Sequence, residues 1–114
     1  MLETFVSLVV MNYATDISDK IKSDFGDKAA DVFTIFDEAI AKTEYLNHNR
    51  IIRCILFLAE KNIDKLKKKI ETAEYDPRDV MLLAEYKETG RQFHPKRIRD
   101  FNRIFAECEI DVKE

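Results

Sequence analysis

Residues 51–59 read Ile51-Ile52-Arg53-Cys54-Ile55-Leu56-Phe57-Leu58-Ala59, and Arg53 is the only charged residue in this run. In a helix, Arg53 would share one narrow polar strip with Arg50, Glu60 and Lys61, while most of the remaining circumference would be apolar. A helix with so little polar surface is normally surrounded by other helices. We therefore expect the helix over residues 49–61 to lie at the centre of its fold.

The segments on both sides of this run repeat apolar residues every three or four positions, which is typical of amphipathic helices. The chain has only 2 Gly and 2 Pro, fewer than the many turns of an all-β protein require. The predicted fold is therefore all-α, an irregular bundle of about six helices joined by short loops. The expected helices span residues 2–24 (with a break allowed near 14–16), 28–45, 49–61, 63–75, 77–88 and 95–105.

Length and composition favour a single soluble domain over residues 1–114, because 114 residues with 46% hydrophobic content suffice for one core. The net charge of −3 gives no general attraction to nucleic acid or to an anionic membrane. Two cysteines without a secretory leader favour reduced thiols, so we expect a cytoplasmic protein. The apolar run 5–11 is too short to span a membrane, and Glu3 precedes it where a leader would carry a basic residue.

The same run makes the first predicted helix apolar on nearly all sides. Such a helix is either deeply buried or shared with a partner. A start of the chain at Met11 would instead leave residues 1–10 as an extension. If the helix is shared, the candidate dimer face consists of Phe5, Leu8, Val9 and Met11.

A basic segment lies at residues 91–103, with a net charge of +4 in a chain of −3, so the rest of the chain carries −7. Its candidate binding residues are Arg91, His94, Lys96, Arg97, Arg99 and Arg103. Arginine offers planar pairs of donors that suit phosphate, and a helix at 95–105 would place Lys96, Arg99 and Arg103 on one face. The alternative is that these residues are solvated and pair with the acidic majority. An acidic pI of about 5.5 favours that alternative over nucleic-acid binding.

Arg50 and Arg53 form a second charged candidate on the polar strip of the central helix. Partly buried charges persist when they are paired, so we expect carboxylates from neighbouring helices, with Asp79, Glu85 and Asp100 as possible partners. The competing interpretation is a charged pocket for a small anion.

The sequence contains no arrangement that is typical of an enzyme or a metal site. Its His and Cys residues form no pair with metal-ligand spacing, and two isolated glycines cannot make a phosphate loop. We predict no metal, no cofactor and no catalytic residues. The predicted function is a non-enzymatic protein-interaction module that binds a protein partner or self-associates, and the alternative is polyanion or nucleic-acid binding through residues 91–103.

Overall fold

The computed structural model describes residues 13–86 and 96–110. Its α-helices are α2 (Thr15–Phe25), α3 (Ala29–Lys42), α4 (Asn49–Ala59), α5 (Ile63–Tyr75) and α6 (Pro77–Glu85). Short 3₁₀ turns occupy Gly26–Lys28, Glu44–Leu46 and Phe105–Glu107. In these two ranges the structure has no β-strand, so the predicted all-α class is confirmed. None of the helices in this part of the chain is long and apolar enough to cross a membrane.

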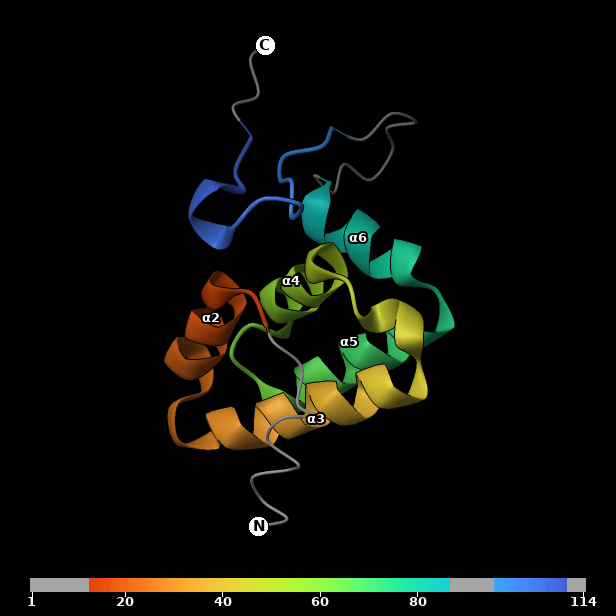
Figure 1. Ribbon diagram of the computed structural model, residues 1–114. Helices are drawn as coiled ribbons and strands as arrows, with labels where there is room; N and C mark the ends of the chain where they lie inside the picture. The colour runs from red at the N-terminus through yellow and green to blue at the C-terminus, as the bar shows by residue number, and fades with distance from the viewer. Residues whose placement is uncertain (1–12, 87–95, 111–114) are drawn as a thin grey trace.

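Helix α4 lies at the centre of the fold, as its narrow polar strip predicts. Arg53 is 4% exposed even though it is charged, and residues 51–56 are all buried. Helices α5, α6 and α2 all pack against α4, while α3 lies beneath them (Figure 1). This arrangement surrounds α4 with other parts of the chain, which is why almost every position of the helix is apolar.

Turn chemistry sets the helix boundaries in the middle of the chain. Helix α4 ends at Ala59 because Glu60 and Lys61 adopt positive φ angles of 52° and 65°. The side chain of Asn62 then caps α5 by accepting a hydrogen bond from the backbone N–H of Lys65 at 2.9 Å.

Helix α6 begins at Pro77, the first residue of the predicted helix 77–88, and Asp followed by Pro is a sequence typical of a helix start. Asp76 Oδ1 accepts the N–H of Arg78 at 3.1 Å, and Pro77 occupies the first turn, where its missing N–H costs no helical hydrogen bond. The helix ends at Glu85, earlier than the predicted limit of residue 88, because Tyr86 is already extended.

The predicted helix at 95–105 is wrong. Residues 96–110, which we call the C-terminal strap, contain no α-helix. The strap pairs in isolated antiparallel bridges, Tyr86 with Arg97 and Arg99 with Glu109. The backbone N–H groups of Phe101 and Phe105 donate to carboxylates on α6 and α2 instead of to helical carbonyls. Tertiary hydrogen bonds therefore satisfy donors that a helix would have satisfied internally.

The predicted number of about six helices is not confirmed, because the segment expected to form the last one is not helical. At the other end, α2 begins at Thr15, inside the break allowed near 14–16. Residues 13 and 14 of the predicted helix 2–24 are not helical, and its earlier part, including the candidate dimer face Phe5, Leu8, Val9 and Met11, falls in residues 1–12, outside the described ranges.

Candidate functional site

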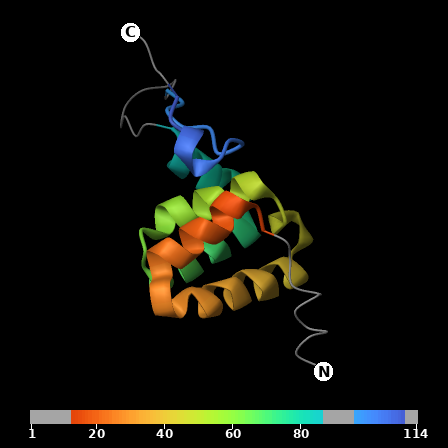
Figure 2. The same cartoon turned by 60° about the vertical axis from the view of Figure 1, so that its left-hand side comes forward.

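The C-terminal strap lies over the side of α4 that is opposite to α3 (Figures 1 and 2), between α2 and α6 (Figure 1). Two acidic side chains hold it there, Glu85 from α6 and Asp16 from α2. Two arginines from α4 hold these carboxylates in turn. The site therefore joins three helices to a segment that is distant in the sequence.

Glu85 is the inner of the two acidic groups, and it is fully buried. Arg50 approaches it with two donors, Nη2 at 2.6 Å from Oε1 and Nε at 3.1 Å from Oε2. Arg97 of the strap adds Nη2 at 3.2 Å from Oε1, and the backbone N–H of Phe101 lies 2.9 Å from Oε2. A buried carboxylate with two cationic partners and one backbone donor is compensated for its lost hydration.

Asp16 and Arg53 form the outer pair, with two parallel hydrogen bonds of 2.9 Å. Asp16 also accepts the backbone N–H of Phe105 at 3.0 Å. Burial alone raises the pKa of Asp16, but the hydrogen bonds from Arg53 and Phe105 outweigh it and leave this pKa below its ordinary value. Asp16 is therefore held in its charged form.

Arg53 also reaches the main chain of the strap. Its Nη1 donates to the carbonyl of Phe101 at 3.1 Å and lies 3.4 Å from the carbonyl of Asn102. One guanidinium therefore binds a carboxylate with one edge and backbone carbonyls with another, a geometry that lysine cannot reproduce.

Aromatic side chains fix the strap from its apolar side. Phe101 is fully buried, and its ring centroid lies 5.4 Å from that of Phe57 on α4 and 5.8 Å from that of Phe105. Lys20 of α2 lies over the Phe105 ring at 5.3 Å. The strap is thus held by hydrogen bonds to its main chain and by burial of its aromatic rings.

The described arginines of the predicted basic segment turn inward or pair with nearby acids. Arg97 binds Glu85 and Asp100, and Arg103 lies 3.5 Å from Asp100. The guanidinium of Arg99 lies 4.3 Å from the centroid of the Phe57 ring and donates to the carbonyl of Ala84. Lys96 is exposed, while Arg91 and His94 lie outside the described residues. Because residues 96–105 form no α-helix, the predicted helical face with Lys96, Arg99 and Arg103 does not form.

Arg50 and Arg53 both meet carboxylates, as expected for charges on the strip of a central helix. Glu85 was among the partners considered for them, but Asp16 was not. In the sequence, Asp16 directly precedes Ile17 of an apolar repeat, a position that is typical of a helix cap. It lies instead in the first turn of α2 and directs its carboxylate at α4. Asp16 lies beside the stripe of Ile17, Ile21 and Phe25, and a charged residue next to such a stripe cannot be assigned to a particular buried partner from periodicity alone.

A second feature lies on α6. Its inner side buries Val80, Ala84 and Glu85, while Leu82 and Leu83 on the outer side are 52% and 54% exposed. Arg78 and Asp79 are also exposed, one helical turn before the leucines. We call Arg78, Asp79, Leu82 and Leu83 the outer face of α6.

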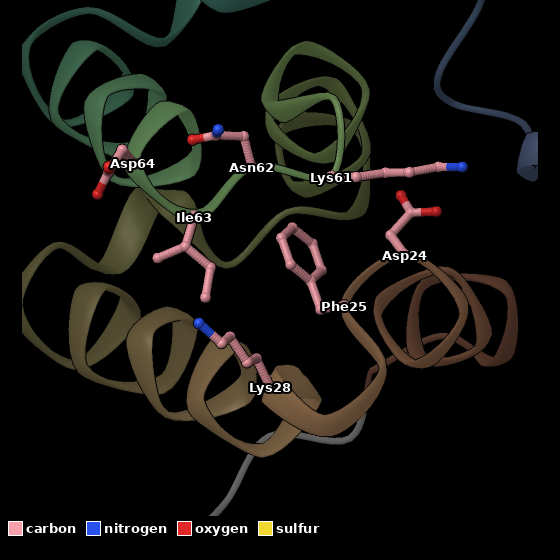
Figure 3. Close-up of a pocket in the computed structure, with 7 residues that line it drawn as sticks. All are labelled: Asp24, Phe25, Lys28, Lys61, Asn62, Ile63 and Asp64. Carbon is pink, nitrogen blue, oxygen red and sulfur yellow. The ribbon is translucent and has the colours of Figure 1, made fainter.

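A cavity of about 370 Å³ lies between the end of α2 and the turn from α4 to α5. Figure 3 shows Phe25 in its middle, with Lys61 and Asp64 directed away from each other on opposite sides. Another cavity of about 400 Å³ lies between α3 and α5, and a Lys42–Glu74 pair at 3.7 Å spans part of its rim. Charged side chains of both signs line each of the two cavities.

The other groups of chemical interest in residues 13–86 and 96–110 are the metal-ligating side chains and the two cysteines. No cluster of three or more His, Cys, Asp or Glu side chains in these ranges could hold a metal ion. Cys54 and Cys108 are both buried and not disulfide-bonded. Burial, and secondarily the carboxylate of Glu85, raises the pKa of the Cys54 thiol, so thiolate chemistry is suppressed there.

Comparison of the chain with protein-family models, with curated proteins and with solved structures finds no match.

Proposed function

We propose that the protein is a non-enzymatic protein-interaction module and that it makes contact through the outer face of α6. The observation that carries this proposal is the exposure of Leu82 and Leu83, each more than half exposed, side by side on a helix whose inner side is fully packed. Adjacent exposed leucines offer apolar area that a contact would remove from water.

The partner inferred first is a second copy of the chain. A twofold contact would place the same leucines of both copies against each other, and Arg78 and Asp79 would supply charges of both signs at its rim. The apolar run 5–11 adds a further surface that the sequence predicts for self-association. A cytoplasmic location belongs to the same proposal.

Sedimentation velocity over a concentration series tests this proposal. We expect the unmodified chain to sediment faster than a monomer and the Leu82→Ser/Leu83→Ser variant to sediment more slowly than the unmodified chain. A Lys67→Ser/Lys68→Ser variant changes two exposed residues of α5 and should behave like the unmodified chain. A monomer at every concentration for all three proteins would refute self-association through α6.

The alternative function, polyanion binding through residues 91–103, receives less support from the geometry. Arg97, Arg99 and Arg103 already have acidic, carbonyl or aromatic partners within the protein. Phosphate contacts would have to compete with these partners. Measuring the affinity of the protein for an oligonucleotide at a series of salt concentrations tests this alternative. Phosphate contacts would make the affinity fall steeply as the salt concentration rises. We expect no such binding.

A further inference from the structure

The C-terminal strap contacts the rest of the described structure, residues 13–86, in the way a bound peptide contacts its receptor. We call residues 13–86 the helical body. Four of its backbone N–H groups donate to body residues: those of Ile98 and Arg99 to the carbonyl of Glu85 at 2.7 and 3.1 Å, that of Phe101 to the Glu85 carboxylate, and that of Phe105 to Asp16. The carbonyl of Phe101 accepts from Arg53. Main-chain contacts of this kind give affinity without demanding a particular sequence.

Side chains of the strap add specificity at a regular spacing. Arg97, Phe101 and Phe105 follow one another at intervals of four residues. The first pairs with buried Glu85, the second is fully buried, and the third lies against Lys20 and Phe101. The pattern that fits the body is therefore Arg-x-x-x-Phe-x-x-x-Phe in a segment without α-helix.

The receptor surface belongs entirely to the helical body. Its polar groups are Asp16, Arg50, Arg53 and Glu85, and its main aromatic contact is Phe57. Arg53 and Glu85 are buried, Asp16 and Arg50 are partly exposed, and all four are positioned by α2, α4 and α6. A buried charge cluster that leaves acceptors for backbone N–H groups suits an incoming main chain.

We propose that this surface is a binding site for a protein segment with the pattern Arg-x-x-x-Phe-x-x-x-Phe, and that the C-terminal strap is its intramolecular occupant. A partner protein that carries such a segment binds by displacing the strap. The proposal is independent of the outer face of α6, because the α6 side chain it uses is the buried Glu85 and none of the outer-face residues.

Tethering determines how the proposal must be tested. Residues 87–95 link the strap to α6, and a short tether of this kind gives an effective concentration in the millimolar range. A free peptide therefore competes poorly with an intact strap. Weakening the strap in the full-length chain makes the site available, and Phe101→Ala is the change that removes its most buried anchor.

The experiment measures fluorescence anisotropy of a labelled peptide with the sequence of residues 96–110. We expect saturable binding to the full-length Phe101→Ala chain, at least about tenfold tighter than to the unmodified chain. A peptide that itself carries Phe101→Ala should not bind. Circular dichroism of the Phe101→Ala chain checks that its helices are intact. A folded Phe101→Ala chain that fails to bind the unmodified peptide overturns the proposal.

Matched variants of the receptor locate the binding. In the Phe101→Ala chain, a further Arg53→Met change should abolish peptide binding, whereas Asp79→Asn, which alters an exposed carboxylate of α6, should leave it unchanged. The Leu82→Ser/Leu83→Ser change should also leave it unchanged, which separates this proposal from the proposed function. Equal affinity with and without Arg53→Met would place the peptide elsewhere and overturn the proposal.

A second measurement covers a Phe101→Ala chain that does not fold. A site for a specific protease is inserted within residues 87–95 of the full-length chain, and the purified protein is then cleaved. We expect the strap fragment to remain bound to the body on gel filtration and to exchange with labelled 96–110 peptide. Release of the fragment without uptake of the labelled peptide contradicts the proposal.

Discussion

The Arg53 guanidinium and the Asp16 carboxylate face each other through two hydrogen bonds of 2.9 Å, from Nε to Oδ2 and from Nη2 to Oδ1. The two residues are 37 positions apart and join α4 to α2. The same arginine donates to the carbonyl of Phe101, and the same aspartate accepts from the N–H of Phe105. One ion pair therefore ties two helices and the C-terminal strap together.

Replacing Asp16 by Ala should lower the free energy of unfolding by about 3 kcal/mol, because Arg53 is then left buried without its counter-ion. Urea unfolding followed by circular dichroism measures the change. Asp19→Ala removes an exposed carboxylate from the same helix and should change stability by less than about 0.5 kcal/mol. Equal losses for the two variants would contradict the role of the ion pair.

Adding Arg53→Met to the Asp16→Ala chain should restore part of the lost stability. The second change removes the unpaired charge and leaves an apolar side chain of similar length in its place. The single Arg53→Met variant supplies the reference. If the double variant loses as much stability as the two single variants added together, the two residues act independently.

Acid should weaken the protein partly through Asp16. Its pKa in the folded state lies below the ordinary value of 3.8, so its contribution to stability is complete above that value and is lost as the pH falls through the folded-state pKa. The free energy of unfolding of the unmodified chain should therefore decline below about pH 4. Asp16→Asn should show a shallower decline, and Asp19→Asn serves as its control. Parallel pH curves for the unmodified and Asp16→Asn chains would contradict this assignment.

The Glu85→Gln change should destabilise the protein by about 2–4 kcal/mol, because Arg50 and Arg97 lose their shared negative partner in a buried position. Asp79→Asn is the matched control, since Asp79 lies on the exposed side of the same helix. Thermal unfolding of both variants measures the difference. A Glu85→Gln chain as stable as Asp79→Asn would show that the buried carboxylate is not needed as an anion.

The centre of the fold could be predicted from the sequence because it depends on local, repeated signals. The apolar run 51–59 predicted a surrounded helix, and Asp76-Pro77 predicted the start of α6. Both features follow from periodicity and from backbone hydrogen bonding within a few residues.

The C-terminal strap could not be predicted in the same way. The spacing of Phe101 and Phe105 fits one face of a helix equally well, and nothing local indicates that their N–H groups bind Glu85 and Asp16. The basic segment was misleading for the same reason, since the internal partners of Arg97 and Arg99 come from other parts of the chain. Tertiary contacts between distant residues overrode the local pattern.

The two thiols should differ in reactivity. Burial raises the pKa of both Cys54 and Cys108, so alkylation of the folded protein should be slow at each. Cys108 belongs to the strap, whereas Cys54 is in the central helix, so detachment of the strap alone should expose Cys108 first. Mass spectrometry of chains alkylated for increasing times gives the order. Earlier labelling of Cys54 would contradict a strap that detaches separately from the body.

Amide hydrogen exchange at Phe101 and Phe105 tests most directly the claim that two carboxylates hold the main chain of the strap. We predict that both amides exchange slowly in the unmodified protein, that Glu85→Gln speeds exchange chiefly at Phe101, and that Asp16→Asn speeds it chiefly at Phe105. Exchange of both amides at the rate of an unprotected peptide in the unmodified protein would contradict the account.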